Sequence, residues 1–142
     1  MKVGKSGERY LIRLEPGDEI IETLQKWCRT QGIVNASIEG IGSVENPTLA
    51  HYRRDTKKFS EKQLRGIFEV VSLSGNVGLV DGDEPLVHLH ATLSNEDMQA
   101  LGGHVVEAVC SATGELVLTP LSTAFRKNYN EDIGLKVWDF DV

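Results

Sequence analysis

The sequence predicts an α+β domain, in which a largely antiparallel or mixed β-sheet packs against one main amphipathic helix. Only one stretch has apolar residues at helical spacing, whereas many short stretches alternate or run apolar as strands do. Short glycine-, proline- and asparagine-containing turns separate these stretches. One helix among many closely connected strands is typical of this class. The length of 142 residues suits one domain, so we expect residues 1–142 to fold as a single unit.

The helix is expected to follow a first strand at residues 9–14 and a turn at Pro16-Gly17. Asp18 is expected to cap the helix by accepting backbone N–H groups, and Gly32 to end it. The apolar residues that share one face at a spacing of three and four are Ile20, Ile21, Leu24, Trp27 and Cys28.

After the helix the sequence predicts strands joined by short turns. Residues 40–43 form a tight turn, residues 54–58 the tip of a hairpin, and residues 81–83 a hairpin turn. Gly75-Asn76 is expected to interrupt a strand, and residues 95–101 to form a helical turn. The predicted strands are residues 34–38, 48–53, 66–74, 77–80, 86–93, 104–110, 115–120 and 133–140.

Three of the four histidines lie close together in the sequence. Side chains alternate between the faces of a strand, so His88 and His90 are expected to share one face while Leu89 points to the other. His104 follows a polar loop and Gly102-Gly103, and its strand can return beside the first two. Three neutral imidazoles with one open position form a zinc site of the catalytic type.

These histidines also have a plain structural interpretation, in which the imidazoles lie on a polar sheet face and contact only water. The paired glycines before His104 favour a crowded site, because glycine lets the backbone approach a neighbour closely or adopt a positive φ. The residues alone leave both interpretations open.

Charge argues against unaided binding to nucleic acid. The net charge is −6 and the sequence pI is near 5.2, whereas nucleic-acid binding needs a basic face that displaces counterions. Asp55 and Glu61 interrupt the one basic stretch, and no aromatic cluster offers base stacking, so a solvated hairpin is favoured. Its basic residues are Arg53, Arg54, Lys57, Lys58, Lys62 and Arg65.

The sequence predicts a cytoplasmic protein without a membrane span. It has no apolar run long enough to cross a bilayer, and its first residues lack the apolar core of a signal peptide. Cys28 and Cys110 lie in apolar patterns and are expected to be buried free thiols.

Other polar residues carry weaker signals. Gly40-Ile41-Gly42-Ser43 is not a phosphate-binding G-x-G-x-x-G loop and is better explained as a tight turn, although a ligand-facing loop stays open. Glu69 and Glu107 are potential acid–base groups that more often would face solvent in such strands. His51 is interpreted as a surface residue.

Taken in order, several motifs resemble those of the plants and prokaryotes conserved (PPC) domain family, and the chain is similar to the free-standing prokaryotic type. The resemblance covers nearly the whole chain. Its motifs are Arg13-Leu14-Glu15-Pro16-Gly17-Asp18-Glu19, Gly40-Ile41-Gly42-Ser43, residues 66–76, His88-Leu89-His90 and Gly102-Gly103-His104.

The resemblance implies a compact α+β fold, a homotrimer, and a zinc site on His88, His90 and His104. Plant members use the domain to form trimers and to contact transcription factors, and they bind DNA through a separate AT hook built around Arg-Gly-Arg-Pro. This chain contains no such sequence, so DNA binding does not carry over through any of its residues.

Three functions follow as hypotheses. The leading one is a non-enzymatic trimeric domain that binds a protein or small-molecule partner and holds zinc, although imidazole also suits nickel, copper and iron. The first alternative is a zinc-dependent enzyme acting on a small oxygenated metabolite, with the metal as Lewis acid; we lean against it because no nucleophile or base is evident. The second is a transcription-linked DNA-binding protein.

Overall fold

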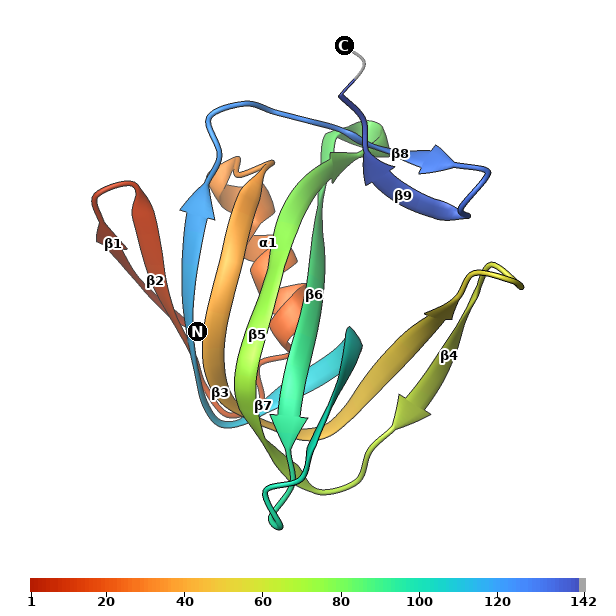
Figure 1. Cartoon of the computed structure of the whole chain (residues 1–142). Helices are drawn as coiled ribbons and strands as arrows, with labels where there is room; N and C mark the ends of the chain where they lie inside the picture. Colours follow the sequence, from red (N-terminus) through yellow and green to blue (C-terminus); the bar gives the residue numbers. More distant parts are fainter. Residues whose placement is uncertain (141–142) are drawn as a thin grey trace.

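A computed structural model describes residues 1–140, and its strands curve into a barrel-like sheet with a single helix (Figure 1). This confirms the predicted α+β class with one main helix. Most of the chain is extended. The elements are β1 (Lys2–Ser6), β2 (Arg9–Leu14), α1 (Ile20–Gln31), β3 (Ala36–Arg53), β4 (Lys58–Gln63), β5 (Ile67–Val80), a 3₁₀ turn (Asp81–Asp83), β6 (Glu84–Ser94), β7 (Ala100–Pro120), β8 (Lys127–Asn130) and β9 (Leu135–Trp138).

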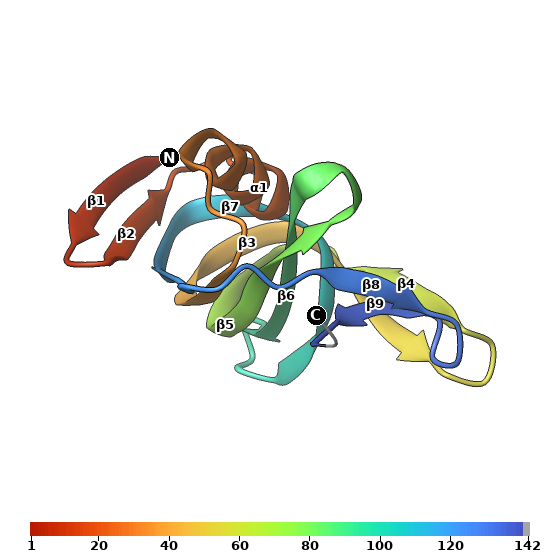
Figure 2. The same ribbon diagram turned by 90° about the horizontal axis from the view of Figure 1, so that it is seen from above.

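Seven strands form one sheet in the order β1-β2-β7-β6-β5-β3-β4, and β7 pairs with β3 as well. All these pairings are antiparallel. The additional pairing closes β3, β5, β6 and β7 into a ring, which the view from above displays (Figure 2). β8 and β9 form a separate two-stranded hairpin.

The helix covers the inner face of the ring and buries Ile20, Leu24 and Cys28 against it. Gly32 ends the helix in the left-handed conformation (φ 66°), as predicted, because glycine adopts this conformation without a Cβ clash. The predicted cap is wrong by one residue. Glu19 caps the helix by accepting the N–H of Glu22 at 2.6 Å.

β3, β5 and β7 are longer than the sequence predicted, whereas β9 is shorter than the strand predicted at residues 133–140. β3 runs through the turn predicted at residues 40–43, and β5 runs through the interruption predicted at Gly75-Asn76. β7 joins the strands predicted at residues 104–110 and 115–120, and residues 95–101 form no helix. Gly75 shows the reason, since a Cβ there would lie 2.0 Å from the carbonyl oxygen of His88. The glycine therefore permits close contact between β5 and β6 instead of ending β5.

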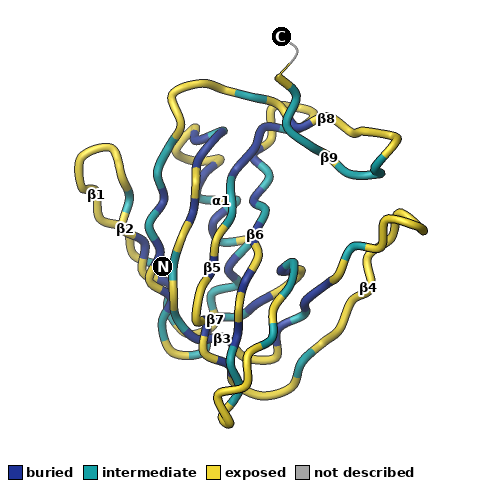
Figure 3. Tube along the Cα trace, in the orientation of Figure 1, coloured by how far each residue is buried: buried dark blue, intermediate teal, exposed yellow. Residues whose placement is uncertain are grey.

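Burial follows from this arrangement. The core lies between the helix and the ring, whereas β1 and β4 at the ends of the sheet are exposed (Figure 3). Both predicted buried thiols, Cys28 and Cys110, are free and buried. Within the described residues, no helix is long and apolar enough to span a bilayer.

Candidate metal centre

Strand register brings the three predicted histidines together. His90 lies opposite His104 in the β6–β7 pairing, and His88 lies two residues before His90 on the same face of β6. Leu89 between them is fully buried in the core on the other face. The prediction that His88 and His90 share a face, with His104 returning beside them, agrees with this geometry.

The three imidazoles face one another closely. Each offers a ring nitrogen, and these nitrogens all lie within 4.8 Å of one another. The Nε2 atom of His88 lies 3.1 Å from the Nδ1 atom of His104. Two nitrogens bound to one tetrahedral zinc at 2.0–2.1 Å would lie about 3.3 Å apart, so this pair already has the spacing of two ligands.

Close strand approach produces the crowding that the paired glycines predicted. A Cβ on Gly102 would lie 2.6 Å from the carbonyl oxygen of Ala91, and one on Gly103 would lie 2.9 Å from that of Ala50. Neither glycine has a positive φ. They are needed for the packing of β7 against β6 and β3, which places His104.

Electrostatics favour the neutral imidazoles that bind metals. Burial, followed by the positive charge of Lys127 and then by the other two histidines, lowers the pKa of His88 to about 4. Burial likewise lowers the pKa of His104, with a smaller opposite effect from Glu61. A neutral ring keeps a lone pair free for a metal at neutral pH.

The histidines open into a cavity of about 740 Å³. Its polar floor is the imidazole cluster, and its walls come from β3, β4, β6, β7, β9 and the start of the helix. Such concave sites with apolar walls and few polar groups are typical of small-molecule binding. The lining residues outside the cluster are Ile21, Ala50, His51, Tyr52, Phe59, Leu86, Val87, Gly103, Val105, Val106, Leu135 and Lys136.

The β3–β4 and β8–β9 hairpins lie on the same side of the molecule (Figure 1), and two hydrogen bonds join them. The Tyr52 hydroxyl on β3 donates to the carbonyl oxygen of Ile133 in the β8–β9 turn. The Lys57 ammonium donates to the carbonyl oxygen of Glu131 at 2.5 Å. The basic β3–β4 hairpin is therefore exposed, as predicted, but its tip also holds the β8–β9 hairpin in place.

The sequence missed two residues next to the cluster. Asn76 lies opposite His88 in the β5–β6 pairing, and the buried ammonium of Lys127 donates to its side-chain oxygen. The sequence predicts a strand interruption at Asn76, and Lys127 lies in a polar segment without a local pattern. Only the fold shows that the two segments meet.

The other candidate residues lie outside the cluster. Glu69 and Glu107 are exposed, as the structural interpretation expected, and neither lines the cavity. His51 is exposed and lines the cavity without joining the three imidazoles. The residues 40–43 belong to β3, where the register shifts between Gly40 and Gly42.

Fold and site together define a small β-barrel-like domain with a three-histidine cluster suited to a metal. A family model of the Plants and Prokaryotes Conserved (PCC) domain, the PPC domain of the sequence analysis, matches residues 1–122. The chain belongs to this family. Among the curated proteins, no sequence matches it.

Solved structures of similar proteins agree with this assignment. A presumed DNA-binding protein from Bacteroides thetaiotaomicron is 32% identical with a TM-score of 0.94, and the match covers 99% of this chain and 98% of that chain. A PPC protein from Pyrococcus horikoshii is 32% identical with a TM-score of 0.86, and the coverage is 97% and 93%. A metal-containing protein from Archaeoglobus fulgidus is 31% identical with a TM-score of 0.84, and the coverage is 96% and 94%.

The lowered pKa of His88 predicts a pH-dependent stability for the metal-free protein. An unfolded histidine has a pKa near 6.5, whereas folded His88 has one of about 4, so between these values the unfolded chain binds more protons. Stability is then fully present above pH 6.5 and falls as the pH drops toward 4. Thermal unfolding of chelator-treated protein across this pH range should show the loss of stability. The loss should be smaller in the His88→Asn variant. An equal loss of stability in the wild type and the variant would contradict the assignment of this pH dependence to His88.

Proposed function

We propose that this protein is a metal-dependent binding domain for a small molecule, with one divalent metal ion held by His88, His90 and His104. The observation that carries the proposal is the group of three imidazole nitrogens within 4.8 Å at the floor of a cavity. The residues fit such an ion, because their spacing approaches that of tetrahedral ligands and because burial keeps His88 and His104 neutral.

Zinc is the metal that we propose, as the resemblance implies. Imidazole nitrogen is among its preferred ligands, and three protein ligands leave a fourth position for water or a bound molecule. A similar protein from Archaeoglobus fulgidus is described as metal-containing, which supports a metal without identifying it. A zinc-dependent enzyme acting at the open position remains the alternative, since a metal there would polarise a bound oxygen.

DNA binding receives less support from the residues. The structural neighbour described as a presumed DNA-binding protein favours it. The net charge of −6 opposes it, and the basic hairpin also binds the β8–β9 turn through Lys57. We retain the predictions that the chain alone does not bind duplex DNA tightly at physiological salt and that the protein is cytoplasmic.

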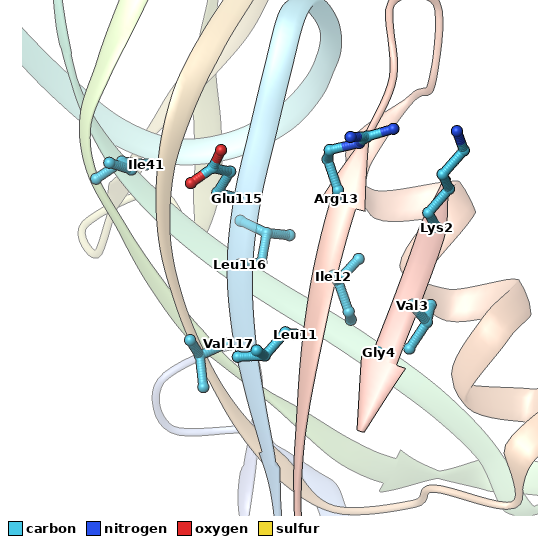
Figure 4. Close-up of a pocket in the computed structure, with 10 residues that line it drawn as sticks. All are labelled: Lys2, Val3, Gly4, Leu11, Ile12, Arg13, Ile41, Glu115, Leu116 and Val117. Atoms are coloured by element: carbon cyan, nitrogen blue, oxygen red, sulfur yellow. The ribbon is translucent and has the colours of Figure 1, made fainter. Parts of the chain in front are cut away.

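We further propose that the chain forms a homotrimer, the assembly that the resemblance implies. Several apolar side chains are exposed on the outer face of the sheet, and large exposed apolar areas commonly mark association. Leu11 and Ile41 on β2 and β3 are 51% and 58% exposed, and both line an open hollow beside β1 and β7 (Figure 4). Val71 and Ile67 on β5 are 54% and 66% exposed.

The metal site predicts that protein purified without a histidine tag or chelator holds close to one divalent metal ion per chain. His90→Ala should lose most of this metal, because two imidazoles bind zinc far more weakly than three. The matched control is His51→Ala, which removes another cavity imidazole but leaves the cluster intact. Elemental analysis after gel filtration measures both. The assignment fails if the wild type remains metal-free after zinc is added at neutral pH, or if the two variants retain equal metal.

The trimer predicts a particle of three 15.7 kDa chains, a mass of about 47 kDa. Light scattering during gel filtration measures this mass at micromolar concentration. Leu11→Glu combined with Ile41→Glu should yield monomers, because buried unpaired carboxylates oppose association. Lys5→Glu on the exposed β1 strand is the control for added negative charge. A monomeric wild type, or a double variant that stays trimeric, would refute this interface.

A further inference from the structure

Lys127 is a buried cation beside the proposed metal site, and no carboxylate within residues 1–140 pairs with it. Its side chain is on β8, and the residue is only 4% exposed. Burying a charged group is costly unless an opposite charge or strong hydrogen bonds compensate it. Among residues 1–140 the structure records two contacts for this ammonium, the side-chain oxygen of Asn76 and the ring face of Trp138 at 4.7 Å. Both are favourable, but neither carries a negative charge.

Gly78 on β5 leaves the space that the side chain of Lys127 occupies. The aliphatic part of Lys127 lies over Gly78, where a Cβ would come within 2.6–3.0 Å of three of its carbons. Gly78 and Asn76 are two residues apart on β5, so both face the side of the sheet where His88 stands opposite Asn76. A larger residue at position 78 would therefore displace the lysine side chain.

The charge of Lys127 reaches the cluster. Its ammonium is held by Asn76, the residue that lies opposite His88 in the β5–β6 pairing. A divalent ion on three neutral imidazoles would add two further positive charges next to it. Glu61 exerts an acidic influence on His104, but this carboxylate is exposed to solvent on β4. The loaded site would therefore carry an excess of positive charge in a partly buried place.

We infer that the cavity binds a small organic carboxylate, with its charged end at the metal's open position and its apolar part along the cavity walls. The carboxylate supplies the negative charge that the metal and Lys127 lack. The apolar part follows from the walls, where Phe59, Leu86 and Leu135 are prominent. This inference rests on the proposed function and names the class of molecule that the site takes.

Two variants test whether the charge of Lys127 attracts the ligand or whether the lysine only anchors the β8–β9 hairpin. Asn76→Asp keeps the lysine in place and gives it a permanent carboxylate partner, so the attraction for an external anion is lost while the β8–β9 hairpin stays anchored. Lys127→Met removes the charge and keeps the length of the side chain. The control is Lys62→Met, which removes an exposed lysine of equal charge on β4 outside the cavity lining.

The probes are benzoate, acetate and inorganic phosphate, titrated by calorimetry into zinc-loaded protein whose metal content and melting temperature are measured first. We expect benzoate to bind more tightly than acetate and more tightly than phosphate. Asn76→Asp and Lys127→Met should weaken benzoate binding roughly tenfold, the effect expected for one charge at short range in a partly buried site. Lys62→Met should stay within about twofold of the wild type.

The failures are distinguishable. If the protein binds no zinc, the proposed function fails and the inference fails with it. If zinc binds but benzoate does not, or if Asn76→Asp retains full benzoate affinity at full metal content, only the carboxylate inference fails. Tighter binding of phosphate than of benzoate would also overturn it. Should Lys127→Met unfold, Asn76→Asp alone decides the question.

Discussion

The antiparallel pairing of β6 with β5 on one side and β7 on the other determines where every group of the site lies. This register sets Asn76 opposite His88 and His104 opposite His90. A shift by one residue would move His88 and His90 into the core and Leu89 out of it. The fully buried Leu89 therefore secures the position of both imidazoles, because its removal from water stabilises only the observed register.

Electrostatics and packing act together once the register is set. Partial burial makes His88 and His104 poor bases and leaves their lone pairs free. The same burial makes Lys127 an unusual neighbour, since burial lowers the pKa of its ammonium and disfavours its charge. An anion at the open metal position would offset the positive charges of the metal and of Lys127. Metal binding, ligand charge and the placement of the β8–β9 hairpin are linked in this account.

The helix and the three-histidine motif were predictable from the sequence because both follow from local periodicity. Alternation along one strand places His88 and His90 on one face. Antiparallel pairing with the next strand along the chain is enough to bring His104 beside them. Long-range pairing was not predictable in the same way. The sequence around Gly75 predicts an interruption, although a glycine also permits close strand approach, and a local pattern does not separate the two. Lys127 is distant in sequence from Asn76, so nothing in its surroundings indicated that contact.

X-ray absorption spectroscopy of the zinc-loaded protein tests the central claim most directly, because it counts the ligands and measures their distances. We expect a four-coordinate zinc with three imidazole nitrogens at about 2.0–2.1 Å and one oxygen ligand from solvent or a carboxylate. Added benzoate should change the fourth ligand and leave the three imidazoles bound. A spectrum showing fewer than three imidazoles, or a thiolate sulfur at about 2.3 Å, would contradict the account.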